Sequence, residues 1–237
     1  MNSSSAATSS MSAFREVRRV QQSVLTRLER RTLQWLAVRL PGAIHSDHLT
    51  ILALVAMVGA GGSYWLASVT PVGLLLAIAC LAANWFGDSL DGTIARVRNQ
   101  QRPRYGYYVD HVVDAVGTIF LFGGLALSGY MSPLVAATLL VAYFAVCLEV
   151  YLAAHSVGDF EMSFLGLGPT ELRILLAVGN LALLAHPTAT VFGHVFKLFD
   201  IGALIGACGL TVTFVSSAIR HTRELYQLEP RMGARHR

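Results

Sequence analysis

The chain has 237 residues, of which 54% are hydrophobic and only 14% are charged. A soluble domain usually carries about 25% charged residues, so this composition disfavours a soluble protein and favours a membrane protein. The formal net charge of +4 would be compatible with nucleic-acid binding, but no nucleic-acid motif accompanies the arginines, so we expect no nucleic-acid partner. The positive charge is better explained by contacts with anionic lipid headgroups and by membrane topology.

The N-terminal region divides into two segments. Residues 1–12 are mostly Ser and Ala and lack the apolar core of a secretory signal, so we expect a disordered tail. Residues 13–47 carry apolar side chains at nearly helical spacing, as at Val17, Val20 and Val24, with arginines between them. This pattern predicts an amphipathic juxtamembrane helix on the membrane surface. A lid or a dimer contact is the alternative role for this helix.

Six apolar segments follow, and crossing a membrane takes roughly 20 residues. The segments are His48–Val69, Val72–Gly87, Tyr107–Gly129, Pro133–His155, Glu171–His186 and Lys197–Ile219. The second and the fifth are short. The sequence therefore predicts an all-α polytopic membrane domain of six transmembrane helices over residues 48–219, followed by a basic tail over residues 220–237. Glycines such as Gly61 and Gly62 permit close helix contact, either within one molecule or between two.

The arginines predict the orientation of the chain, because positively charged loops stay in the cytoplasm. With six spans both termini lie on the same side. Every arginine of the chain then falls on that side, and the single lysine, Lys197, falls on the other. We therefore expect an integral membrane protein whose termini face the cytoplasm.

Four aspartates form two pairs, Asp88 with Asp91 and Asp110 with Asp114. Residues three or four apart share a helix face, so the two side chains of each pair project together. Asp88 and Asp91 lie at the end of the second span, and Asp110 and Asp114 lie at the start of the third. The short connection makes these spans antiparallel neighbours, so the two pairs can meet near the cytoplasmic face. A carboxylate within a membrane costs roughly 2.5–3.5 kcal/mol, and one or two divalent metal ions would relieve that cost.

Small residues and an arginine accompany the aspartates. Gly92 and Ala95 leave room for a large ligand group to approach the backbone, and Gly106 does the same on the next helix. Arg96 supplies a planar, permanent cation suited to phosphate. Helix caps and salt bridges would explain a single aspartate, but the whole pattern favours metal-assisted phosphate chemistry.

The stretch from Asp88 to Asp114 resembles the signature of the CDP-alcohol phosphotransferase family, D-x2-D-G-x2-A-R-x8/9-G-x3-D-x3-D, and matches every fixed position. The resemblance implies a six-helix membrane fold, often a homodimer, that joins an alcohol to the phosphorus of a CDP-linked donor and releases CMP in phospholipid biosynthesis. It also implies ligands for two ions, Mg²⁺ or Mn²⁺, and contacts for the CDP group. The implied metal ligands are Asp88, Asp91, Asp110 and Asp114, and the implied CDP contacts are Asp88, Gly92, Ala95, Arg96 and Gly106.

The attacking hydroxyl needs a base nearby, and two residues are candidates for this catalytic role. Asp114 occupies the position of the usual base in the family. The pair Asp110-His111 resembles a step in the choline and ethanolamine phosphotransferase branch, in which the histidine is a candidate base. The residues that follow, Val112 and Val113, replace the usual Gly-Cys of that branch. A hydrogen-bonded interfacial histidine is the alternative for His111.

Glu149 bears on the identity of the substrate. It lies about 9 Å by helical rise from the cytoplasmic end of its span, where a carboxylate can pair with a choline or ethanolamine cation, helped by Tyr143 or Tyr151. An ion pair with Arg173, or a hydrogen bond to a neighbouring helix, is the alternative.

Arg173 is the only basic residue expected within a span. A phosphorylated acceptor needs cations beside the metals, so this scarcity disfavours one, although Arg98, Arg102 and Arg104 can still fold over the site. We therefore favour CDP-choline or CDP-ethanolamine with diacylglycerol as substrates. CDP-diacylglycerol with serine, inositol phosphate or glycerol phosphate is the alternative. Glu149 and Arg173 are the candidate substrate contacts.

A non-catalytic membrane scaffold or a metal-ion transporter is the alternative of another class. A transport path usually places polar residues across the full depth of the membrane. Here the ionisable residues within spans gather toward one end, apart from Asp200. We expect Asp200 to be a surface residue at the opposite end, so the pattern favours an enzyme.

Overall fold

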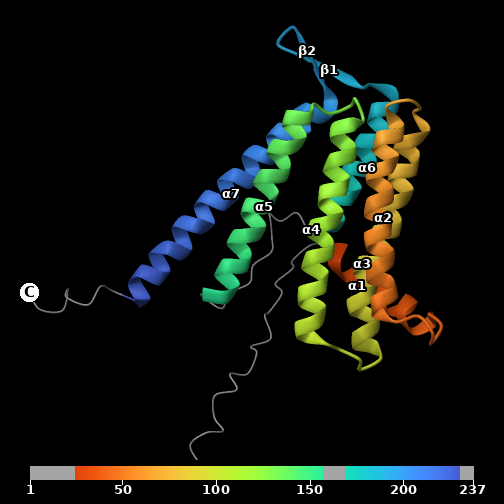
Figure 1. Cartoon of the computed structure of the whole chain (residues 1–237), viewed down its shortest axis with the longest axis vertical. Coiled ribbons are helices and arrows are strands. Elements are labelled where there is room, and N and C mark those ends of the chain that lie inside the picture. Colours follow the sequence, from red (N-terminus) through yellow and green to blue (C-terminus); the bar gives the residue numbers. More distant parts are fainter. Residues whose placement is uncertain (1–24, 157–168, 230–237) are drawn as a thin grey trace, which may run out of the picture.

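The computed structural model describes residues 25–156 and 169–229. Within these ranges it contains seven helices and one β-hairpin (Figure 1). The elements are α1 Leu25–Arg39, α2 Ser46–Ala67, α3 Val72–Val97, α4 Pro103–Leu127, α5 Pro133–Ser156, α6 Pro169–Ala185, β1 Thr188–Val191, β2 His194–Lys197 and α7 Leu198–Leu228. The predicted tail over residues 1–12 and residues 13–24 of the predicted juxtamembrane helix lie outside the described residues.

Among the described residues, five helices are long and apolar enough to cross a membrane, namely α2, α3, α4, α5 and α7. The fifth expected span, Glu171–His186, corresponds to α6, which has 17 residues and falls short of the roughly 20 that cross the hydrocarbon core. The predicted all-α membrane class is therefore confirmed, and the count of six spans is not.

Helix α1 packs on the end of the bundle where α3 ends and α4 begins, which we call the aspartate end. Its Leu33 and Ala37 join an apolar cluster with Leu49 of α2 and with Leu90 and Ile94 of α3. Burying these side chains against two of the long helices anchors α1 to the bundle, since each apolar side chain removed from water contributes roughly 1.5–3 kcal/mol.

Helices α3 and α4 each approach α2 so closely that backbone meets backbone. A Cβ atom added at Gly124 of α4 would lie 2.0 Å from the carbonyl oxygen of Gly61 on α2. A Cβ atom at Gly87 of α3 would lie 2.6 Å from the carbonyl oxygen of Leu49. Small residues that let helix backbones touch are a common basis of packing in membranes. Gly61 therefore serves packing within the molecule, whereas no described atom lies within 4 Å of a Cβ at Gly62.

Helix α6 is held to α2 by a buried polar contact. The Tyr64 hydroxyl donates a hydrogen bond of 2.9 Å to Oδ1 of Asn180, and both side chains are fully buried. Interhelical hydrogen bonds in membranes contribute on the order of 1 kcal/mol. Because α6 is short, such polar contacts help to fix its position against the longer helices.

The end of the bundle opposite the aspartate end carries the hairpin of β1 and β2 (Figure 1). Its turn places Phe192 and Gly193 at positive φ, 50° and 82°, the backbone that tight two-residue hairpins require. The hairpin was not predicted, and the last helix begins at Leu198 rather than at Lys197.

Asp200, near the start of α7, was expected at the surface, and the structure has it half-buried and hydrogen-bonded. Its two carboxylate oxygens accept hydrogen bonds from the backbone N–H and the hydroxyl of Ser132, each of 2.6 Å. Asp200 therefore ties the first turn of α7 to the segment that precedes α5. At the other end, α7 continues to Leu228, so residues 220–228 of the predicted tail are helical.

Candidate active site

Three aspartates from two helices converge at the aspartate end. One carboxylate oxygen from each of Asp88, Asp110 and Asp114 lies within 4.8 Å of the other two. Asp88 comes from α3, while Asp110 and Asp114 are one helical turn apart on α4 and so share a face. Three carboxylates at this separation repel one another unless a cation lies between them. Oxygen donors of this kind suit a hard divalent ion such as Mg²⁺ or Mn²⁺.

The fourth aspartate, Asp91, has different partners in the structure. Its Oδ2 accepts a hydrogen bond of 2.7 Å from the hydroxyl of Thr50 on α2, and its Oδ1 accepts one from the backbone N–H of Gly92. Asp91 therefore lies beside the three-aspartate cluster with its carboxylate oriented by α2. Sequence reasoning missed Thr50, because a single threonine within an apolar helix carries no signal of its partner.

Asp88 is also paired with a cation from another helix. Nη2 of Arg173, on α6, donates to Oδ2 of Asp88 at 2.6 Å, and Nε of the same guanidinium donates to Oδ1 of Asn84 at 2.8 Å. Arg173 therefore belongs to the aspartate site. The alternative that Arg173 forms an ion pair with Glu149 is wrong, because its guanidinium faces α3.

The small residues of the motif leave open space beside the aspartates. A Cβ atom at Gly106 would meet no described atom within 4 Å, so packing among the described residues does not require glycine there. At Gly92 the nearest neighbour of an added Cβ is the guanidinium of Arg96, at 3.4 Å. Nη2 of Arg96 also donates to the hydroxyl of Thr93 at 3.2 Å. Gly92 and Arg96 are thus adjacent, and a phosphate beside Gly92 would meet the arginine.

His111 and Asp114 both lie near α5, but in different surroundings. Nδ1 of His111 donates to the backbone carbonyl of Tyr107 at 2.6 Å, since a carbonyl oxygen can only accept. The imidazole packs against the rings of Tyr107 and Tyr151, with centroids 4.2 Å and 5.0 Å away. Asp114 is close enough to Tyr143 and Tyr151 to interact with them electrostatically. His111 therefore packs against aromatic rings beside the cluster, and the cluster itself consists of the three carboxylates.

Glu149 is buried and forms a hydrogen-bonded pair with a residue of the last helix. Its Oε1 lies 2.6 Å from Nδ1 of His221 on α7, and the glutamate is 8% exposed. This geometry matches the alternative in which Glu149 hydrogen-bonds to a neighbouring helix. His221 was missed because it falls within an arginine-rich segment that predicts only a basic tail.

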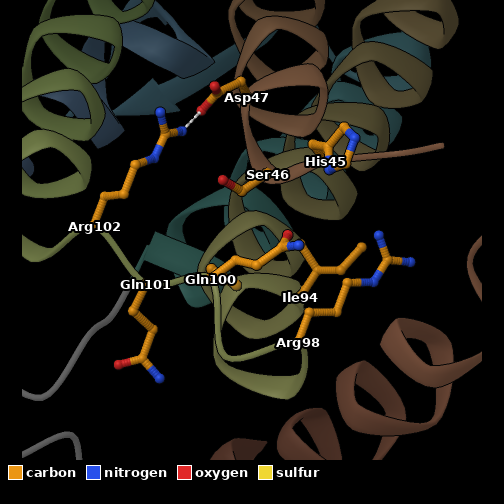
Figure 2. A pocket seen from close by; sticks show the side chains of 9 residues that line it. His45, Ser46, Asp47, Ile94, Arg98, Gln100, Gln101 and Arg102 are labelled. Atoms are coloured by element: carbon orange, nitrogen blue, oxygen red, sulfur yellow. Dashed lines mark hydrogen bonds and ion pairs between the residues drawn. The ribbon is translucent and has the colours of Figure 1, made fainter. Parts of the chain in front are cut away.

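A polar pocket of about 470 Å³ lies between the start of α2 and the α3–α4 connection (Figure 2). The residues that line it are His45, Ser46, Asp47, Ile94, Ala95, Arg98, Gln100, Gln101 and Arg102. Figure 2 shows Arg102 paired with Asp47. Arg98 donates to the carbonyls of Leu40 and Pro41 at 2.9 Å and 3.0 Å. Arg98 therefore holds the connection between α1 and α2, and Arg102 binds the first turn of α2. Neither of these two arginines folds over the aspartate cluster.

The comparison with known protein families decides the family. A model described as CDP-alcohol phosphatidyltransferase matches residues 44–215, which is most of the chain. The chain belongs to this family. A search of curated proteins found no match. The CDP-alcohol phosphatidyltransferase family transfers a phosphate-containing group from a CDP-alcohol to an alcohol and uses a divalent metal. The cluster of Asp88, Asp110 and Asp114 has the donor atoms and the spacing that fit such an ion.

Proposed function

We propose that this protein is a phospholipid-synthesising transferase that moves a substituted phosphoryl group from a CDP-linked donor to an alcohol and releases CMP. The observation that carries the proposal is the convergence of Asp88, Asp110 and Asp114 at one end of the membrane helices. We further propose that this end and both termini face the cytoplasm, because the arginines gather there, and that the protein acts as a homodimer.

The residues of the site have separate roles in metal binding and in CDP binding. Asp88, Asp110 and Asp114, with Asp91 beside them, would hold two divalent ions. Such ions screen the pyrophosphate, polarise the attacked phosphorus and stabilise the CMP leaving group. Gly92, Ala95 and Gly106 leave room for the CDP group. Arg96 contacts phosphate through its planar guanidinium.

Asp114 is the base that we favour for the attacking hydroxyl. Its carboxylate lies within the cluster where the donor phosphate must bind, so a hydroxyl next to the phosphorus is also next to Asp114. A base must be within hydrogen-bond reach of the proton that it takes. His111 lies one turn earlier on the same helix, with Nδ1 directed to the backbone of Tyr107, and stays the alternative base.

As substrates we favour CDP-choline or CDP-ethanolamine together with diacylglycerol. A phosphorylated acceptor would need cations beside the metals. Arg98 is engaged with the α1–α2 connection, and Arg102 is engaged with Asp47 at the start of α2. Arg173 is engaged with Asp88. The aromatic rings of Tyr143 and Tyr151 near Asp114 suit an ammonium group. CDP-diacylglycerol with a small polar alcohol is the competing substrate pair.

Lipid products identify the reaction directly. The purified protein in detergent is supplied with diacylglycerol plus CDP-choline or CDP-ethanolamine, and separately with CDP-diacylglycerol plus serine, inositol phosphate or glycerol phosphate. We expect an aminoalcohol phospholipid by mass spectrometry, CMP release in step with it, and loss of both when EDTA removes the divalent ion. A product only from CDP-diacylglycerol would reverse the substrate assignment. If neither substrate pair releases CMP, the protein is a membrane scaffold or a metal-ion transporter instead of an enzyme of this kind.

Glu149→Gln tests whether this carboxylate contacts the substrate. The substitution removes the negative charge, so we expect the KM for CDP-choline or CDP-ethanolamine to rise more than the Kd for CDP itself. The matched control is His221→Leu, which removes the hydrogen-bond partner of Glu149 and leaves the carboxylate in place. If the two variants change both constants equally, Glu149 serves only to join α5 to α7.

A further inference from the structure

The cluster's Asp88 is held by a chain of polar contacts that begins in the interior of the bundle. Nδ2 of Asn84 donates to the backbone carbonyl of Ala53 on α2 at 3.0 Å. Oδ1 of the same amide accepts from Nε of Arg173 at 2.8 Å, and Nη2 of Arg173 donates to Asp88 at 2.6 Å. The chain of contacts therefore joins α2, α3 and α6 and ends on a carboxylate of the aspartate cluster.

The amide of Asn84 has only one orientation that satisfies these contacts. Asn84 is 3% exposed, so water does not compete for its polar atoms. Turning the amide over would direct its NH₂ group at the guanidinium of Arg173 and its oxygen at the carbonyl of Ala53. Both contacts would then be repulsive, because donors would face donors and acceptors would face acceptors. The hydrogen bond to the backbone of α2 therefore fixes the orientation of the Asn84 amide.

Arg173 binds two consecutive turns of α3 with one edge of its guanidinium. Asn84 and Asp88 are four residues apart and share a face of α3. Nε and Nη2 lie on the same edge of the planar group, so the two contacts together set the plane of the guanidinium. One oxygen of Asp88 is bound by the arginine, and the other remains available to a metal ion shared with Asp110 and Asp114.

We infer that Asn84 and Arg173 are positioning residues that orient the Asp88 carboxylate for binding a divalent metal ion. The inference rests on the proposed function, since it concerns the ion that the cluster would hold. Partners of this kind, which bind a metal ligand rather than the metal, orient the ligand, and losing one typically lowers metal affinity by about 10–100-fold. Asn84 reaches Asp88 only through Arg173, since its hydrogen bonds go to the backbone of Ala53 and to that guanidinium. Because Asn84 carries no charge, its effect on Asp88 is one of orientation alone.

The test is the binding of Mn²⁺ to the purified full-length protein, measured by electron paramagnetic resonance without any substrate. We expect Asn84→Leu, which keeps the size of the side chain and removes both hydrogen bonds, to raise the Kd for Mn²⁺ by about 10-fold or more. Arg173→Lys keeps the positive charge but cannot bind Asn84 and Asp88 with one planar edge. It is expected to weaken binding similarly, and it decides the question if Asn84→Leu does not fold.

Tyr64→Phe is the matched control. It removes a buried hydrogen bond that joins α2 directly to α6. That bond lies away from the aspartates, so the Kd for Mn²⁺ should stay unchanged. An equal loss of affinity in Tyr64→Phe would show that Asn84 acts only by holding α6, and would overturn the inference. Wild-type affinity in folded Asn84→Leu or Arg173→Lys would also overturn it. If the wild-type protein itself bound no Mn²⁺, the metal site of the proposed function would fail instead.

Discussion

Asp114→Asn is expected to lower turnover by roughly 10³-fold or more while the protein stays folded. The amide has the shape of the carboxylate but no negative charge, so it binds a divalent ion poorly and cannot take a proton from the attacking hydroxyl. The fold should survive because relieving repulsion with Asp88 and Asp110 offsets the lost interactions. CMP release from a radiolabelled CDP donor measures turnover, and thermal unfolding in detergent reports the fold.

The control for this prediction is another aspartate of the membrane helices. Asp200 lies at the opposite end of the bundle and binds Ser132. Asp200→Asn removes the same charge away from the cluster, so it should retain turnover even if it lowers stability. A wild-type rate in Asp114→Asn would remove Asp114 from the mechanism and transfer the role of base to His111.

Gly124→Ala is expected to destabilise the protein by about 3 kcal/mol or more and to abolish activity with it. The added Cβ atom would lie 2.0 Å from the carbonyl oxygen of Gly61 and 2.5 Å from its Cα. These are backbone atoms that cannot rotate away, so α4 must move away from α2. Because α4 carries Asp110 and Asp114, this movement also separates two carboxylates of the cluster from Asp88. The melting temperature in detergent and the rate of CMP release measure the two effects.

The neighbouring glycine provides the control. A Cβ atom at Gly123 meets no described atom within 4 Å, so Gly123→Ala adds the same methyl group on the same helix without a clash. It should leave the melting temperature and the activity close to wild type. If Gly124→Ala and Gly123→Ala proved equally harmless, the contact between α2 and α4 would be looser than the structure has it.

Much of the site was predictable because its pattern is local. The spacing of Asp110 and Asp114 puts them on one helix face wherever the helix lies, and the short α3–α4 connection keeps the end of α3 and the start of α4 at the same end of α2, on which both helices pack. These two facts are enough to bring Asp88 toward them. Asp91 shows the limit of such reasoning, because its spacing from Asp88 did not reveal that Thr50 of α2 would bind its carboxylate.

The membrane class, the α-helical fold and the meeting of the aspartates could be predicted from the sequence, because hydropathy and helical periodicity act over a few turns of one chain. Which helices supply the partners of the buried charged groups depends on the tertiary packing. Arg173 and Asp88 are 85 residues apart, and His221 and Glu149 are 72 apart. In an apolar environment a buried charge takes whichever opposite charge or hydrogen-bonding group the helix packing brings within reach, and that packing depends on close contacts such as the one between Gly61 and Gly124.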